Sequence, residues 1–277
     1  MEEPQQLRVT ALIVCHNQAS ALKRCLDALQ LSNNRTTLEV LVVDDGSSDG
    51  SAEVASEFAD VILLRVPKRL GYTRAVNIGL GTAKGKLILL LPTNFHVQPE
   101  TIGVLADRLE ASNETGAVCP AVDRAWAFPK PEELAEAWKS GVLPGAIQMG
   151  NGETSVDYPM GAPILVRREL LRNMNWLDKR FGNAWSDLEM CCRIRNGNKN
   201  IIVLGALPVN HDPVESPTVD EEEWADSAHG VATWIGLHHG TGAAVKFRLA
   251  AALHALGRGK FGVFTSILTG NKIDGNQ

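Results

Sequence analysis

The sequence predicts an α/β fold in which a mostly parallel sheet is flanked by helices. Apolar, strand-like runs alternate with helical segments through the first half of the chain, and each run ends at a polar cluster. Alternation at this spacing implies right-handed crossovers, which place the carboxyl ends of the strands along one edge of the sheet. Ligands of open α/β sheets bind beyond that edge, so these polar clusters mark the predicted site.

The first strand is predicted over residues 8–15, RVTALIVC, and it ends at His16 and Asn17. The helix that follows carries leucines at 22, 26 and 29, a spacing that puts them on one helical face. His16 and Asn17 therefore lie at a switch from strand to helix, on the predicted ligand edge.

The second strand lies in residues 38–50, LEVLVVDDGSSDG, which are wholly apolar until Asp44 and Asp45. A strand that is buried on both faces has this continuous pattern. The serines and Asp49 can cap a helix over residues 52–58. Two adjacent carboxylates repel each other unless a ligand or another group offsets their charge. A capped turn therefore does not explain why Asp44 and Asp45 are neighbours. On this segment alone, a ligand site and a structural turn are equally good interpretations.

Two further strands are predicted over residues 61–66 and 87–91. The first precedes KRLGYTRAVNIGLGTAKG, in which Arg74 and Asn77 are one helical turn apart. The second precedes PTNFHV. Four polar strand ends are therefore expected on one side of the sheet.

In this order the motifs resemble those of the family 2 glycosyltransferases, which have the GT-A (nucleotide-diphospho-sugar transferase) fold. The resemblance covers about residues 8–212. Its pieces, in chain order, are ALIVCHN, VLVVDDGSSDGS, GYTRAVNIG, LILLLPTNFHVQPE, GAPILVRRELL and FGNAWSDLEMCCRIRNGNKNIIVLGALPVNH. Each piece alone is weak evidence, whereas six pieces in the right order are strong evidence.

The resemblance implies an inverting hexosyltransferase of rhamnosyltransferase-like pattern that acts in cell-surface polysaccharide biosynthesis. Its donor is expected to be a UDP or dTDP sugar, and its acceptor a glycan or a lipid-linked hydroxyl. The resemblance assigns Asp44 to the base edge, where a carboxylate accepts the imide hydrogen of uracil or thymine, and Asp45 to the ribose. Arg74 and Asn77 are expected to face the diphosphate or to hold the loop. The expected nucleotide-binding residues are His16, Asn17, Asp44, Asp45, Arg74 and Asn77.

A divalent metal, Mn²⁺ or Mg²⁺, is the cofactor that the resemblance implies, held by a DxD-like pair after the fourth strand. Here Pro92 and Asn94 occupy the two acidic positions. Proline has no side-chain ligand and asparagine offers one neutral oxygen, so low metal affinity is expected. His211 matches the late histidine that binds metal or diphosphate in relatives, which makes Asn94 and His211 the expected metal residues. His96 is equally well a ligand or a solvent-facing residue.

The catalytic base is expected at Asp187. In many relatives an acidic pair begins a helix and its second carboxylate is the base; here the pair reads Ser186-Asp187. An aspartate in the first turn of a helix also interacts favourably with the helix dipole, so a structural role for Asp187 is the alternative. Trp185 and Glu189 are assigned to the acceptor side, where the Trp185 ring either stacks on a sugar or only caps the core.

The departures at Pro92, Asn94 and Ser186 support a second interpretation. In it, the chain is a degenerate, non-catalytic relative that binds nucleotide sugar, a glycan or a partner protein. A measurement of sugar-transfer turnover distinguishes the enzyme from the non-catalytic relative.

Composition limits the remaining classes. A net charge of −5 argues against a nucleic-acid binder, which needs a clustered basic surface. Five cysteines without metal or disulfide spacing are expected as reduced core residues. The start MEEPQQ is not a signal peptide and no apolar run is long enough to span a membrane, so a cytoplasmic protein is expected.

Residues 1–240 are predicted to form the GT-A domain, with a nucleotide half at about 8–122 and an acceptor half at about 123–240. Residues 241–277 read as a basic amphipathic extension. Such a helix lies on an anionic membrane, here the inner membrane face, or packs back on the catalytic domain, which is the commoner outcome. The oligomeric state is not readable from the sequence.

Overall fold

The computed structural model describes residues 7–33, 37–212 and 220–270. Its strands are β1 Val9–Cys15, β2 Leu38–Asp44, β3 Val61–Arg65, β4 Leu87–Leu90, β5 Phe95–His96, β6 Thr115–Cys119, β7 Arg124–Ala125, β8 Ile147–Gln148, β9 Glu153–Val156, β10 Ile164–Arg167, β11 Asn200–Leu204 and β12 Asn210–His211. Its helices are α1 Ala19–Gln30, α2 Ser51–Ser56, α3 Tyr72–Thr82, α4 Thr101–Glu110, α5 Pro131–Ser140, α6 Arg168–Asn173, α7 Ser186–Asn196, α8 Glu221–His239, α9 Thr241–Gly257 and α10 Phe261–Thr269.

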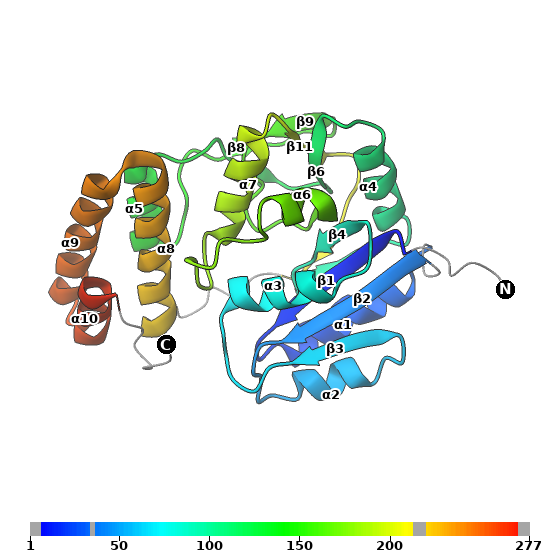
Figure 1. The fold of residues 1–277 in the computed structure, drawn as a ribbon, viewed down its shortest axis with the longest axis horizontal. Coiled ribbons are helices and arrows are strands. Elements are labelled where there is room, and N and C mark those ends of the chain that lie inside the picture. Colours follow the sequence, from blue (N-terminus) through cyan, green and yellow to red (C-terminus); the bar gives the residue numbers. More distant parts are fainter. Residues whose placement is uncertain (1–6, 34–36, 213–219, 271–277) are drawn as a thin grey trace.

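The central sheet has eight strands in the order β3-β2-β1-β4-β10-β6-β11-β9 (Figure 1). β3, β2, β1 and β4 are parallel neighbours, as are β6 and β11. β10 runs antiparallel between β4 and β6, and β9 runs antiparallel along β11. The predicted mostly parallel sheet with flanking helices is confirmed.

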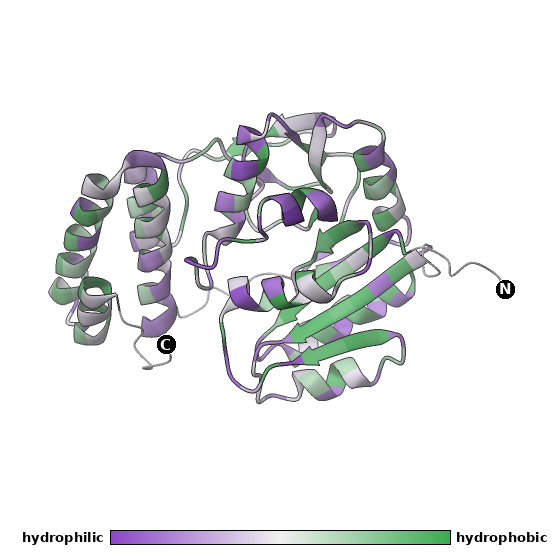
Figure 2. Cartoon of the chain, viewed as in Figure 1, coloured by the Kyte–Doolittle hydropathy of each residue, from purple (hydrophilic) through white to green (hydrophobic). Residues whose placement is uncertain are grey.

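Burial on both faces explains the continuous apolar pattern of β2. All seven of its residues are buried. Leu41 and Val43 belong to the core cluster on one face of the sheet, and Val40 and Val42 to the cluster on the other. The strands of this half are correspondingly hydrophobic in Figure 2. β3 differs because it is the edge strand, and none of its residues is fully buried.

The predicted segments agree with the observed ones to within two residues at most ends. The main shift is at α2, which begins at Ser51 and ends at Ser56 instead of covering residues 52–58. Gly50, in the left-handed region at φ 89°, precedes it, while Asp49 accepts a hydrogen bond from the backbone N–H of Ala19 at the start of α1. Asp49 therefore links two helix starts.

Two short strands complete the edge at which the polar clusters meet. β5 pairs antiparallel with β12, with Phe95 opposite His211 and His96 opposite Asn210. This ladder brings the late histidine, more than a hundred residues away along the chain, to the end of β4.

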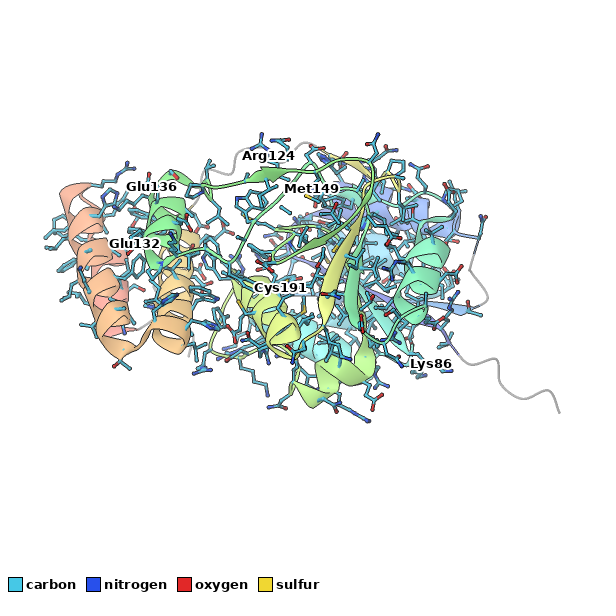
Figure 3. All side chains as sticks on the ribbon, turned by 90° about the horizontal axis from the view of Figure 1, so that it is seen from above. Lys86, Arg124, Glu132, Glu136, Met149 and Cys191 are labelled. Carbon is cyan, nitrogen blue, oxygen red and sulfur yellow. The ribbon has the colours of Figure 1, made fainter. Side chains whose placement is uncertain are left out.

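A helical layer of α5, α8, α9 and α10 lies at one end of the molecule (Figures 1 and 3). Trp138 of α5 and Trp224 of α8 stack with ring centroids 4.7 Å apart. Each indole N–H donates to the other residue's carbonyl, at 3.0 and 3.1 Å. The two helices after Gly240, α9 and α10, pack on each other and on α8. Between this layer and the sheet lies α7, marked by Cys191 in Figure 3.

Two expectations from composition can be checked in the fold. The five cysteines are free and buried, as predicted. Within the described ranges, no helix combines the length and the apolar character needed to cross a membrane.

Two glycines of α3 should respond in opposite ways to alanine. A Cβ at Gly79 would overlap the Leu12 side chain beneath α3, whereas a Cβ at Gly81 meets nothing within 4 Å. We expect Gly79→Ala to lower the free energy of unfolding by about 1–3 kcal/mol through overpacking. Gly81→Ala should raise it by about 0.5–1 kcal/mol because alanine is the better helix former. Urea unfolding of both variants checks this; equal effects would contradict the close packing of α3 on β1.

Candidate active site

Asp44 and Asp45 end β2 with different surroundings. Asp44 is fully buried; its Oδ1 accepts the backbone N–H of Ser47 at 3.0 Å. Its Oδ2 has no hydrogen-bond partner within the described residues, and Arg65 Nε lies 3.5 Å away. Asp45 accepts the backbone N–H groups of residues 70–71 at 2.7 and 3.0 Å. Asp45 therefore fixes the loop before α3, whereas Asp44 Oδ2 is buried beside Arg65 and makes no hydrogen bond within the described residues.

His16 and Asn17 lie against the same turn. The Nδ1 atom of His16 is 2.8 Å from the Asp45 carbonyl oxygen, and Asn17 Oδ1 accepts the backbone N–H of Ser48 at 2.8 Å. Asn17 adopts φ 53°, a left-handed conformation that asparagine tolerates. The structure thus brings four of the predicted nucleotide residues together: His16, Asn17, Asp44 and Asp45.

Arg74 and Asn77 of α3 have different surroundings. Asn77 accepts the N–H of Leu177 at 3.0 Å and donates to the Leu177 carbonyl at 2.9 Å. Its amide is therefore used to hold a loop, one of the two roles expected for it. Arg74 is exposed and makes no ion pair with the described part of the chain.

A cavity of about 570 Å³ lies beyond the end of β4; we call it the main cavity. It brings together four predicted site residues from distant parts of the chain: Asn94, Trp185, Asp187 and His211. Tyr72 and Tyr158 also line it. His96 is not among its lining residues, since its Nε2 lies 3.4 Å from Asp212, which pairs with Arg24 of α1.

The donor groups at this edge do not fit a resident divalent cation. Across residues 7–33, 37–212 and 220–270, no three His, Cys, Asp or Glu side chains are grouped so that they could hold a metal ion. The main cavity offers an amide oxygen at Asn94 and an imidazole at His211, whereas hard divalent cations take charged oxygens. These two neutral donors are too few for Mn²⁺ or Mg²⁺ alone.

Asp187 lies in the first turn of α7 and is held by a tyrosine. The Tyr158 hydroxyl donates to Asp187 Oδ2 at 2.8 Å. Burial raises the pKa of the Asp187 carboxyl above its ordinary value of 3.8, although the Tyr158 hydrogen bond acts in the opposite direction. A carboxylate with a raised pKa accepts a proton more readily than an exposed one, which is the property a general base needs.

Trp185 precedes α7 in a left-handed conformation, φ 72°. Its indole N–H donates to Ser227 Oγ of α8 at 3.0 Å, and a Cβ at Gly230 would lie 2.8 Å from its ring. One side of Trp185 is therefore fixed on α8 while the residue lines the main cavity.

Glu189 points away from the cavity. It is buried on α7 and contacts His238 of α8, with Oε2 2.6 Å from Nε2, while Arg193 lies 3.7 Å away. Instead of facing an acceptor, Glu189 ties α7 to α8.

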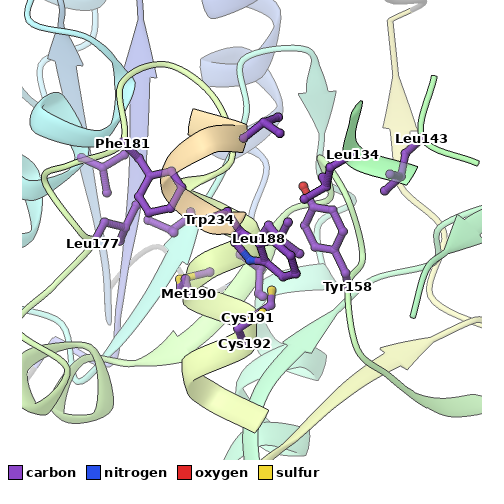
Figure 4. Packing of buried hydrophobic residues seen from close by; sticks show 14 of the residues in the cluster. Leu134, Leu143, Tyr158, Leu177, Phe181, Leu188, Met190, Cys191, Cys192 and Trp234 are labelled. Carbon is purple, nitrogen blue, oxygen red and sulfur yellow. The ribbon is translucent and has the colours of Figure 1, made fainter. Parts of the chain in front are cut away.

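The sequence reasoning missed the two tyrosines beside Asp187. The chain has only two tyrosines, and both have a pKa raised by burial and by the negative charge of Asp187. Figure 4 shows Tyr158 packed with Leu188 and Trp234 in one cluster. The rarity of tyrosine was the available signal, but nothing in the spacing linked residue 158 to residue 187.

Two curated relatives illustrate the sequence similarity. Succinoglycan biosynthesis protein ExoO of Rhizobium meliloti (strain 1021) is 30% identical over 112 residues, which cover 40% of this chain and 32% of that protein. Undecaprenyl-phosphate 4-deoxy-4-formamido-L-arabinose transferase of Aeromonas hydrophila is 31% identical over 109 residues, covering 36% of this chain and 32% of that one. Each match spans about a third of the relative's length.

Solved structures share the fold. GalNAc-T7 with UDP, GalNAc and Mn²⁺ has a TM-score of 0.61 at 16% identity, covering 82% of this chain and 48% of that chain. S. aureus TarS 1–349 with UDP-GlcNAc has a TM-score of 0.59 at 14% identity, covering 83% and 66%. The predicted GT-A fold is thereby confirmed. The model of glycosyl transferase family 2 matches residues 10–174, more than half of the sequence, and the chain belongs to that family.

Proposed function

We propose that the chain is an inverting glycosyltransferase that moves a sugar from a UDP or dTDP donor to a hydroxyl of a glycan or lipid-linked acceptor. One observation carries the proposal: the half-buried carboxylate of Asp187 lines the same cavity as Asn94 and His211 at the end of β4. A base on one side and the expected diphosphate position on the other match what direct displacement needs.

In the proposed reaction, Asp187 takes the proton of the acceptor hydroxyl while that oxygen attacks the anomeric carbon. The bond from that carbon to the diphosphate oxygen breaks, and the diphosphate leaves with the electron pair from the opposite face. Tyr158 orients the base through its 2.8 Å hydrogen bond. Arg74, which has no ion pair within the described ranges, supplies fixed positive charge toward the diphosphate.

The relatives support the substrate classes. Their names include a succinoglycan biosynthesis protein and a transferase named for undecaprenyl phosphate, which are consistent with glycan and lipid-linked acceptors. Both structural neighbours were solved with UDP or a UDP sugar. We assign the imide hydrogen of uracil or thymine to Asp44 Oδ2, which makes no hydrogen bond within the described residues.

The competing proposal is a non-catalytic relative, favoured by Pro92, Asn94 and Ser186. It requires nucleotide or glycan binding without turnover. The half-buried, hydrogen-bonded carboxylate of Asp187 in the main cavity favours the enzyme, because a carboxylate whose pKa is raised in a cavity is typical of catalytic sites.

Peripheral membrane contact is proposed for α9. Val245, Leu249, Leu253 and Leu256 are exposed and fall on one helical stripe, which lies on the part of the molecule farthest from the sheet (Figure 2). Residues 241–270 contain Lys246, Arg248, Arg258 and Lys260 but neither Asp nor Glu. An apolar stripe with only positive flanking charge complements an anionic lipid surface.

Asp187→Asn should separate catalysis from binding. We expect turnover to fall by about a hundredfold or more, because general-base help is lost, while UDP affinity is unchanged. Since activity needs the ionised carboxylate, wild-type activity should fall as the pH drops through its raised pKa. Enzyme assays and calorimetry measure both; unchanged turnover would remove Asp187 from the mechanism.

The same substitution should stabilise the fold. A raised folded-state pKa means that ionisation of Asp187 opposes folding: this cost begins as the pH rises above the unfolded value and is complete above the raised folded value. Asp187→Asn should therefore raise Tm at pH 7. The control Asp178→Asn should lower it, because Arg180 lowers the pKa of Asp178 and thus stabilises the fold through the ionised form.

Asp44 is expected to set the nucleotide preference. UDP and dTDP should bind much more tightly than ADP, and Asp44→Ala or the isosteric Asp44→Asn should remove the difference. The asparagine variant keeps an acceptor for Ser47, which guards against simple misfolding. Equal wild-type binding of ADP and UDP in calorimetry would contradict this assignment.

Metal binding should depend on the nucleotide, because the two expected metal residues, Asn94 and His211, are neutral donors. We expect Mn²⁺ to bind detectably only with UDP present, Asn94→Asp to strengthen this binding and His211→Ala to weaken it. Asn173→Asp, the same change on α6 outside the cavity, is the control. Tight Mn²⁺ binding without UDP would show that the ligands are elsewhere.

The membrane proposal predicts co-sedimentation with vesicles containing phosphatidylglycerol, and much less with phosphatidylcholine alone. Leu249→Gln with Leu253→Gln should weaken it by about tenfold or more, since two exposed apolar side chains are lost. Leu31→Gln, at an exposed leucine beside α1, should leave it unchanged. Equal binding of all variants would exclude the α9 stripe.

A further inference from the structure

A second cavity, of about 380 Å³, lies where α5, α8 and the turn between α9 and α10 meet. It shares Met160 and Trp185 with the main cavity, so the two hollows are separated by a common wall. We call it the cationic cavity, after its charged lining residues Lys139, Arg258 and Lys260.

The charged residues that line the cationic cavity are all positive. No aspartate or glutamate of the described chain lines the cavity. Lys260 is neutralised by Glu221 at 3.0 Å, but Lys139 and Arg258 have no ion-pair partner among the residues that the structure describes. Two uncompensated cations therefore face one hollow, and such a pair favours an anion over a neutral ligand.

The neighbouring His254 lies in the same positive electrostatic field. Burial and the charges of Arg258 and Lys139 lower the pKa of His254, and only Glu136 opposes them. Glu136 lies on α5 (Figure 3), outside the lining of the cavity. Because Glu136 does not line the cavity, it does not offset the positive charge of the lining.

The remaining lining suits a sugar. Trp185 and Trp224 are half-buried and contribute apolar aromatic surface, whereas Trp138 is 3% exposed and stacks against Trp224. Ser140 and Ser227 also line the cavity; the Ser227 hydroxyl accepts the Trp185 indole N–H, and the Ser140 hydroxyl donates to the Glu136 carbonyl. The reciprocal hydrogen bonds of Trp138 and Trp224 hold both rings in place before any ligand arrives. Rigid aromatic surface beside polar groups is the usual composition of a carbohydrate subsite.

Helix dipoles explain part of this arrangement. Lys139 lies in the last turn of α5 and Arg258 caps α9, positions where cations are favourable. The dipoles explain each cation alone. They do not require both cations to face one aromatic hollow that adjoins the predicted base.

We propose that the cationic cavity binds an anionic group, a phosphate or a carboxylate, carried by the acceptor next to its reacting hydroxyl. This inference rests on the proposed function, because it takes the main cavity as the place of transfer. Lys139 and Arg258 would donate hydrogen bonds to the anion while Trp185 and Trp224 contact the attached sugar ring. The acceptor class is then a saccharide that carries a carboxylate or a phosphate, either free or linked to a lipid through that phosphate.

Binding of matched probes tests the proposal in the full chain. Glucose, glucuronate and glucose 6-phosphate differ in charge on one sugar frame, and farnesyl phosphate presents the anion on a lipid. We expect the anionic probes to bind at least about tenfold more tightly than glucose, and Lys139→Gln or Arg258→Gln to remove about tenfold of this affinity. The control Arg172→Gln, an exposed cation on α6, should have no effect.

The outcomes are distinct. Binding of the sugar anions assigns the cavity to a charged saccharide, and binding of farnesyl phosphate alone, weakened by Arg258→Gln, assigns it to a lipid phosphate; both support the proposal. Equal affinity for glucose and glucose 6-phosphate, or variants that bind like wild type, would overturn it. UDP titrated in parallel should bind all variants equally. Failure to bind UDP or any nucleotide sugar contradicts the proposed function instead, whatever the anionic probes do.

Discussion

A relay of hydrogen bonds joins the nucleotide edge of the sheet to the helical layer, and the candidate site depends on it. Asp45 at the end of β2 accepts both backbone N–H groups of the 70–71 loop. The next residue, Tyr72, donates its N–H to Asn183 Oδ1 at 3.0 Å, and the N–H of Asn183 is bound by Asp226 of α8. The loop that leads into Asp187 is therefore fixed from both sides.

The relay is strong because it uses carboxylates as acceptors for backbone N–H groups in a buried setting. Asp45 and Asp226 are at most 9% exposed. Charge-assisted bonds of this kind exceed neutral ones, and removing a partner would leave a buried carboxylate unsatisfied. Gly182 allows the close approach, since any Cβ there would overlap the Asp226 carboxylate. The loop before α7 thus depends on α8 as much as on α7.

The sequence predicted the sheet well because its signal is local. An unbroken apolar run followed by Asp44 and Asp45 identifies both a buried strand and its ligand edge. The contacts around the base were not predictable in this way. Asp187 meets Tyr158 across 29 positions, and Glu189 meets His238 across 49, with no periodic pattern connecting them. Tertiary packing alone turned Glu189 toward α8.

The contact between Asn183 and Asp226 also bears on how the molecule matures. A ribosome releases the nucleotide edge and α7 before α8, because α8 begins only at Glu221. Until α8 emerges, Asn183 lacks its carboxylate acceptor and Trp185 lacks the Ser227 and Gly230 surface on which it rests. The nascent chain can then complete the edge formed by β1, β2 and β3 while the loop before α7 still lacks these contacts. Vectorial synthesis would thereby delay the final arrangement of this loop until α8 has left the exit tunnel.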